Sequence, residues 1–248
     1  MHSGCMSGWR QCLWLGSLAV VLNGCGGNSS GDSDVDLLDP AQPHYGKTYS
    51  EWATEWASYT YRPAPPTCSS PFADESGQDC QLYQDPASPV FFLVGVFGGG
   101  LAHRNACPIP KDKALFFPLL DAMGDNAGLP PQDLRPDSDL LNYMTESFKH
   151  FDPSQLWLIV DGRRISHLER GGVPPTRYVA TLQAGQNALA CAGLPEVEGD
   201  FPGYVTGYWA LLPPLAPGEH RLQFGATDKS ESTTVNTKII DVEYTFSL

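Results

Sequence analysis

Short runs of apolar, β-branched and aromatic residues recur along the chain, and glycine or proline separates most of them. These runs cover residues 90–97, 113–120, 156–160, 178–182, 207–212, 220–224 and 239–248. Apolar runs of this length between turn-forming residues are typical of buried or half-buried strands. The pattern therefore predicts a mainly β protein, built as an antiparallel β-sandwich of the immunoglobulin-like or jelly-roll-like type.

Two segments have helical periodicity instead, which predicts about two peripheral helices at residues 49–60 and 138–149. The first begins with a capping-box sequence, Thr-Tyr-Ser-Glu, and places Trp52, Trp56 and Tyr59 on one face. An aromatic stripe can stack on sugar rings, so these three residues are candidates for ligand binding. Packing of the stripe against a sheet is the favoured interpretation, because a core-facing helix has the same pattern.

A glycine-rich corner follows the run at 90–97 and gives the main candidate for catalysis. His103 and Arg104 lie just after this corner, and Asp121 ends the next apolar run. Loops at strand ends often hold functional side chains. A histidine with a carboxylate can transfer protons, and an arginine can hold an anion. These three residues form the candidate site of a hydrolase or lyase, and a solvated loop is the favoured alternative.

Metal-binding patterns are sparse. His167 and Glu169 alternate on a segment expected to be a strand, which would put both side chains on one face. Two ligands do not make a site, and no zinc or calcium-loop spacing occurs. No cofactor is predicted. Because the chain is strongly acidic, a cation such as calcium is kept as a candidate ligand.

The formal net charge of −13 bears on the partner. A strongly acidic chain repels polyanions, which argues against nucleic acid or an anionic lipid surface as a partner. Signature motifs of serine hydrolases, zinc proteases and nucleotide-binding proteins do not occur in the sequence. The chain is therefore expected to be non-catalytic.

The N-terminal residues predict export. Arg10 precedes an apolar run, Cys12 to Leu22, that falls short of the ~20 residues needed to span a bilayer. The sequence Leu-Asn-Gly-Cys that ends at Cys25 resembles a lipobox, which predicts a lipoprotein signal peptide over residues 1–24. Palmitate and related acyl chains on Cys25 would anchor the protein to the cell-envelope membrane. The residue after Cys25 is not Asp, which favours the outer membrane in a Gram-negative host.

The remaining chain divides into two parts. Residues 25–43 are rich in Gly, Ser and Asp and predict a flexible tether behind the lipid. Residues 44–248 have the length of one β-rich globular domain with a substantial core.

Four cysteines remain in the predicted domain, at positions 68, 80, 107 and 191. An even number in an exported chain predicts two disulfides, for which three pairings are possible. We favour Cys80–Cys107, because a single strand-like run separates these residues. The pair Cys68–Cys191 then follows by elimination.

Several motifs resemble a group of uncharacterised secreted bacterial proteins and lipoproteins. They are YGKTYSEWATEWASY, PVFFLVGVFGG followed by Cys107, KALFFPLL, VDGR and GYWALLPPLAPGEHRLQFGA. The resemblance covers most of residues 45–248 and implies a single domain of shared architecture. It assigns no activity and no catalytic residue.

These observations predict a lipid-anchored bacterial envelope protein. Its expected function is a non-catalytic binding or structural module, with a saccharide, an envelope protein or another envelope component as partner. The alternative is a secreted hydrolase or lyase with its site near His103, Arg104 and Asp121.

Overall fold

The computed structural model describes residues 35–96, 100–228 and 238–248, and strands predominate in them. The helices are α1 (Tyr49–Tyr59), α2 (Asp137–His150) and the short α3 (Ala188–Cys191). The four-stranded sheet has the order β1 (Val90–Phe92), β3 (Ala114–Asp125), β7 (Gly199–Leu212), β6 (Gly172–Leu182). The five-stranded sheet has the order β2 (Gly100–Arg104), β9 (Lys238–Ser247), β8 (Glu219–Asp228), β4 (Leu156–Val160), β5 (Arg163–Arg164). The predicted mainly β class is confirmed.

Two details of the sheets differ from the sequence-based expectation. Each sheet has one parallel pair at its edge, β1 with β3 and β2 with β9, so the sheets are mixed and not wholly antiparallel. The chain leaves β1 to form β2 in the other sheet before it returns as β3. This excursion supplies the long connection that parallel neighbours require. Of the apolar run at 90–97, only Val90–Phe92 form a strand, and this strand lies at the edge of its sheet.

The two sheets contribute to one hydrophobic core. Leu115 and Phe117 of β3 belong to the same buried cluster as Leu222 and Phe224 of β8. The rings of Phe117 and Phe224 are 4.4 Å apart between centroids. The connection over residues 213–218 carries the chain from β7 in one sheet to β8 in the other. Packing between the sheets thus depends on pairs of strands far apart in the sequence.

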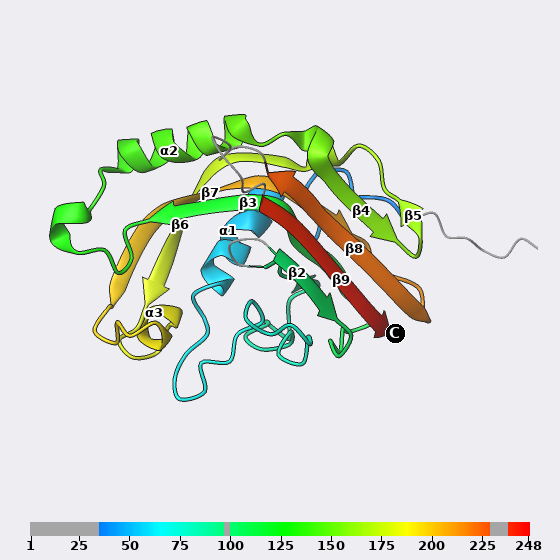
Figure 1. The fold of residues 1–248 in the computed structure, drawn as a ribbon, viewed down its shortest axis with the longest axis horizontal. Coiled ribbons are helices and arrows are strands. Elements are labelled where there is room, and N and C mark those ends of the chain that lie inside the picture. Colours follow the sequence, from blue (N-terminus) through cyan, green and yellow to red (C-terminus); the bar gives the residue numbers. More distant parts are fainter. Residues whose placement is uncertain (1–34, 97–99, 229–237) are drawn as a thin grey trace, which may run out of the picture. The chain divides into compact units, whose positions relative to one another are not determined.

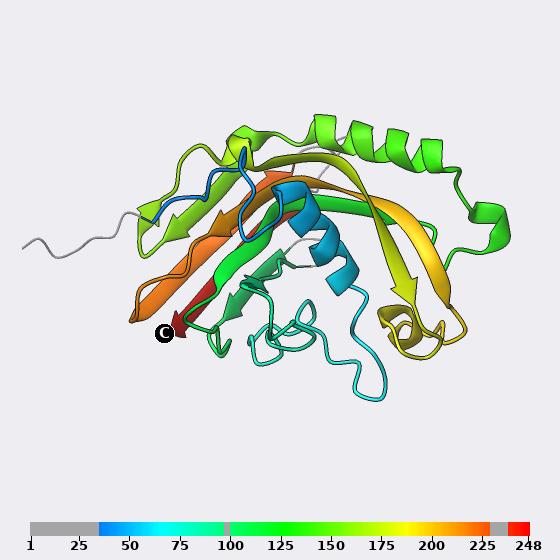
Figure 2. The same ribbon diagram turned by 180° about the vertical axis from the view of Figure 1, so that it is seen from behind.

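The two longer helices lie on opposite sides of the four-stranded sheet (Figures 1 and 2). On the α1 side, Trp52, Trp56 and Tyr59 are 1%, 3% and 1% exposed. The Trp56 ring is 5.0 Å from that of Trp209, and its indole N–H donates to the Leu93 carbonyl over 3.0 Å. The aromatic stripe therefore packs the helix onto the sheet, as the favoured interpretation expected.

The capping box at the start of α1 is present as its sequence predicts. The Thr48 hydroxyl accepts from the Glu51 amide, while the Glu51 carboxylate accepts from the Thr48 amide. On the other side of the sheet, α2 buries Leu140 and Met144 against Tyr204. The neighbouring Leu141 is 37% exposed.

A long irregular segment joins α1 to β1, and two disulfides hold it in place. Cys80 pairs with Cys107, and Cys68 pairs with Cys191 at the end of α3. Both pairings agree with the favoured prediction. The Lys113 ammonium adds a further contact, since it donates to three backbone carbonyls of residues 85–88.

The folded unit begins earlier than expected. The sequence predicts a flexible tether over residues 25–43, but the Leu38 amide donates to the Leu211 carbonyl of β7 over 2.9 Å, and Val35 and Leu37 pack against the inter-sheet core. Three apolar residues among the acids explain this, because they provide buried surface that a Gly/Ser tether lacks. The predicted signal peptide and Cys25 lie outside the described residues. Within the described ranges, no helix combines the length and apolar character needed to cross a membrane.

Candidate functional site

The structure does not bring the three catalytic candidates together. His103 and Arg104 are successive residues of β2, so their side chains point to opposite faces, and Asp121 lies on β3 in the other sheet. His103 is exposed at the register position of Glu243. Across the described ranges, no hydrogen bond or ion pair joins these three side chains.

Arg104 instead holds the fold together. Its side chain is 2% exposed, and its guanidinium donates to the carbonyls of Asp74, Pro71, Val94 and Gly95 over 2.9–3.3 Å. The guanidinium also lies 5.4 Å from the centre of the Tyr244 ring. Backbone carbonyls thus engage four of the five N–H donors of a buried guanidinium, which leaves it poorly placed to bind a substrate anion.

Asp121 is a partly buried carboxyl group at the register position of Gly207. Burial raises its pKa from the ordinary 3.8 to about 7, because desolvation disfavours the charged form. The folded protein thus binds a proton that the unfolded chain releases between about pH 4 and pH 7. Stability is therefore complete below this window and falls as the pH rises through it.

The substitution Asp121→Asn removes this titration. Above pH 7 we expect the variant to be more stable than the wild type by roughly 2 kcal/mol, since one pKa unit is worth ~1.4 kcal/mol and partial exposure reduces the full effect. At pH 4 the two proteins should have similar stability. Urea unfolding at both pH values measures the difference, and a constant difference across the range would contradict the assignment.

The metal candidates do not form a site. His167 and Glu169 are exposed at the start of a 3₁₀ turn (Leu168–Gly171) and not on a strand as predicted, with 3.3 Å between Nδ1 and Oε1. His167 has a φ of 59°, a left-handed conformation that ends the extended chain. Across the described residues, no group of three or more His, Cys, Asp or Glu side chains is positioned to hold a metal ion.

Two hollows flank the C-terminal half of α1, and we call them together the α1 groove. The β6 hollow has a volume of about 330 Å³ and the β1 hollow about 420 Å³. Polar residues of the β6 hollow include Ser58, Tyr61, Arg62, Thr181, Gln183 and Gln186. Residues of the β1 hollow include Tyr45, Lys47, Glu55, Ser58, Arg62 and Asp85. Each volume lies in the range of small-molecule sites.

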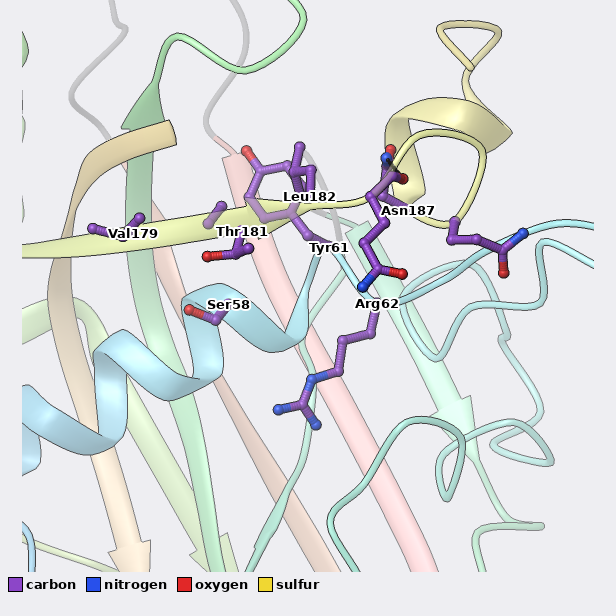
Figure 3. Close-up of a pocket in the computed structure, with 10 residues that line it drawn as sticks. Ser58, Tyr61, Arg62, Val179, Thr181, Leu182 and Asn187 are labelled. Carbon is purple, nitrogen blue, oxygen red and sulfur yellow. Dashed lines mark hydrogen bonds between the residues drawn. The ribbon is translucent and has the colours of Figure 1, made fainter. Parts of the chain in front are cut away.

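The walls of the β6 hollow come from separate elements. Ser58 is on α1, Thr181 is on β6, and Asn187 caps α3, as Figure 3 shows. Two contacts hold these elements together. The Ala188 amide of α3 donates to the Tyr61 carbonyl over 2.9 Å, and the Cys68–Cys191 disulfide joins the segment that follows α1 to the end of α3. The hollow is thus a consequence of tertiary packing and has fixed walls.

Charges are unevenly distributed along the α1 groove. Lys47 forms an ion pair with Glu55 and lies 4.6 Å from the centre of the Trp52 ring. Arg62 is exposed, and its Nη1 donates to the Tyr83 carbonyl over 2.6 Å. Among the described residues, no carboxylate lies within ion-pair distance of Arg62. The groove therefore contains a cation whose charge no neighbouring side chain neutralises.

Tyr61 and Tyr178 share one acceptor beneath the β6 hollow. Tyr61 donates to Asp125 Oδ2 over 2.6 Å, and Tyr178 donates to the same oxygen. The register places Gly203 of β7 between Asp125 and Tyr178, and a Cβ on Gly203 would lie 2.6 Å from the Asp125 Cβ. Only glycine leaves room for the two side chains to meet across the middle strand.

These phenols serve as donors and not as bases. Burial, followed by the charge of Asp125, raises the pKa of Tyr61 above its usual range, and burial with Tyr61 and Asp125 raises that of Tyr178. Both groups stay protonated near neutral pH. A general base for substrate deprotonation needs a pKa near the working pH, so this cluster is structural.

The substitution Tyr178→Phe tests the structural role. We expect the free energy of unfolding to fall by about 1.5–2 kcal/mol, because a buried hydrogen bond to a charged group is lost while the ring volume stays. Urea unfolding measures this change. Tyr143→Phe, on the exposed side of α2, is the matched control and should be neutral. An equal effect of both substitutions would contradict the assignment.

Sequence reasoning did not identify the α1 groove. One signal was available: Glu55 and Ser58 are three positions apart on the side of the first helix that the aromatic stripe leaves free, and Arg62 follows soon after the helix. Thr181 and Gln183, which complete the β6 hollow, lie more than a hundred residues later and give no local signal.

Comparisons with known proteins add no assignment: no family model, curated protein or solved structure matches the chain.

Proposed function

We propose that this protein is a non-catalytic saccharide-binding module of the bacterial envelope, and that the α1 groove is its binding site. The observation that supports this most is the lining of the groove: hydroxyl, amide and charged side chains line the two hollows, and an exposed aromatic ring, Tyr45, lines the β1 hollow. Sugars present hydroxyls for hydrogen bonding and C–H faces for aromatic contact. A mostly polar groove with one such ring suits them better than an apolar ligand.

The proposal includes the fold and the location. The fold is a β-sandwich of the immunoglobulin-like or jelly-roll-like type, supported by two sheets that share one core. Two disulfides favour an oxidising compartment outside the cytoplasm. The lipobox-like sequence at Cys25 favours a lipid anchor, from which the groove would face envelope polysaccharide.

A hydrolase or lyase at His103, Arg104 and Asp121 has less support. Arg104 is engaged by backbone carbonyls, and His103 and Asp121 lie in different sheets. An enzyme would need converging groups around a reacting position.

The test is a binding screen of residues 35–248 with fragments of peptidoglycan, neutral glucans and acidic polysaccharides, followed by thermal shift. A ligand at ~100 times its Kd stabilises by ~2.7 kcal/mol, which raises the Tm of a domain this size by roughly 5–10 °C. The variant Tyr45→Ala/Gln183→Ala should lose this rise. Tyr143→Ala, an exposed tyrosine outside the groove, is the control.

No rise with any saccharide would overturn the proposal. An equal rise in the groove variant would place the binding site elsewhere. Both variants change exposed side chains, so their own Tm values without ligand should stay close to that of the wild type.

A further inference from the structure

The two hollows are adjacent and share two lining residues. Ser58 of α1 and Arg62, which lies three residues beyond the end of this helix, line both of them. A ligand that fills one hollow therefore reaches the residues that border the other. A pair of adjacent hollows beside one helix fits an extended chain better than a single compact sugar.

The charges favour one class of chain. Among the described residues, Arg62 is the only charged residue that lines the β6 hollow. In the β1 hollow, Lys47 is neutralised by Glu55, and Asp85 adds a carboxylate that accepts from the Ala87 amide and forms no ion pair with Arg62. The guanidinium of Arg62 has five N–H donors, and the described residues engage it through one hydrogen bond, to Tyr83. The remaining donors have the planar geometry that binds a carboxylate in a bidentate manner.

The acidic character of the whole protein does not prevent this. Exposed charges more than a Debye length apart, ~8 Å at physiological ionic strength, are largely screened. The local charge at Arg62 therefore decides whether an anion binds there, more than the net charge of −13.

Neutral hydrogen-bonding groups continue on both sides of Arg62. Thr181 lies on β6 and Gln183 directly after it, and Gln183 and Gln186 are exposed. On the other side, Tyr45 is 41% exposed at the β1 hollow. The cation thus lies between a hydroxyl- and amide-lined hollow and one that offers an aromatic ring.

We propose that the α1 groove binds a linear acidic saccharide across both hollows, with Arg62 binding a carboxylate group of the chain where the hollows meet. This inference rests on the proposed saccharide-binding function and specifies its ligand class.

The experiment is calorimetric titration of residues 35–248 with linear oligogalacturonates from dimer to octamer, and with their carboxyl-reduced counterparts. Affinity should rise with length and level off once both hollows are filled. Arg62→Gln should weaken binding of the long acidic chains by about tenfold, the loss of one charge-assisted contact of ~1.4 kcal/mol. Arg62→Lys keeps the charge but not the bidentate geometry and should lie between.

The controls separate this inference from the proposed function. Arg135→Gln changes an exposed arginine outside the groove and should bind like the wild type. Equal binding of acidic and reduced chains, with no effect of Arg62→Gln, would overturn the acidic class but leave saccharide binding intact. A dimer that binds as tightly as the octamer would overturn binding across both hollows. Absence of binding by both series and by every saccharide of the panel would overturn the proposed function itself.

Discussion

Replacement of Arg104 by methionine is expected to lower the free energy of unfolding by about 3 kcal/mol. Each buried carbonyl that loses its hydrogen-bond donor costs ~1–3 kcal/mol, and removal of the buried charge offsets part of this loss. The guanidinium donates to four carbonyls, those of Pro71, Asp74, Val94 and Gly95. Methionine fills much of the same space, so the loss reports on hydrogen bonds and charge more than on a cavity.

The measurement is thermal and urea unfolding at pH 7. For a domain of this size, a loss of about 3 kcal/mol lowers the Tm by roughly 6–12 °C. Arg104→Lys keeps the charge with three donors in place of five, so it should lie between wild type and methionine. Arg135→Met is the matched control on an exposed position and should stay within ~0.5 kcal/mol of wild type. Equal losses at the two positions would show that Arg104 does not hold the irregular segment.

Removal of the Cys68–Cys191 disulfide is expected to have the largest effect on stability, about 5 kcal/mol. The bond joins residues 123 positions apart, whereas Cys80–Cys107 joins residues 27 positions apart. Loss of loop-closure entropy in the unfolded chain scales with the logarithm of loop length, which gives about 3.5 kcal/mol for the shorter loop. The double variants Cys68→Ser/Cys191→Ser and Cys80→Ser/Cys107→Ser compare the two bonds.

Urea unfolding without reductant measures both losses against the wild type. The variant that lacks the long-range bond should be the less stable of the two. The reverse order would mean that contacts made in the folded protein, and not the length of the closed loop, set the contribution of each bond. A third sample, wild type with reductant, should be less stable than either variant.

Removal of the long-range bond also affects the α1 groove. Cys191 ends α3, which follows the Gln186 wall of the β6 hollow, and Cys68 lies in the segment that follows Arg62. Binding of an oligosaccharide by the folded Cys68→Ser/Cys191→Ser variant should therefore be weaker than by the Cys80→Ser/Cys107→Ser variant. The same titration as above gives this comparison.

Several features could be read from the sequence because they depend on nearby residues. The capping box at Thr48 and the aromatic spacing of the first helix are local patterns, and the structure contains both. A hairpin turn at Asp161 and Gly162 joins β4 to β5, and an Asp-Gly pair after a strand is a local signal for such a turn. The disulfide pairing followed from the order of the cysteines and the strand between two of them.

Other features could not be read in this way, because they depend on how distant segments pack. The sequence gives Arg104 the properties of a functional cation, and only the positions of residues 71–95 around it show four carbonyl partners. Asp125 of β3 contacts Tyr178 of β6, and with it Tyr61, because the intervening residue of β7 is Gly203, which has no side chain. The edge position of β1 depends on the passage of the chain through the other sheet.

The sequence by itself determined the mainly β class and the positions of the two longer helices, since periodicity acts over a few residues. For the four cysteines it favoured one of three possible pairings, which the structure contains. Tertiary structure alone decided that Trp52, Trp56 and Tyr59 are core and that Arg104 is a structural cation. It also placed Thr181 opposite Ser58 in the α1 groove. A site of this kind arises where a helix packs on a strand more than a hundred residues later in the sequence. Local sequence patterns do not show which distant segments pack together.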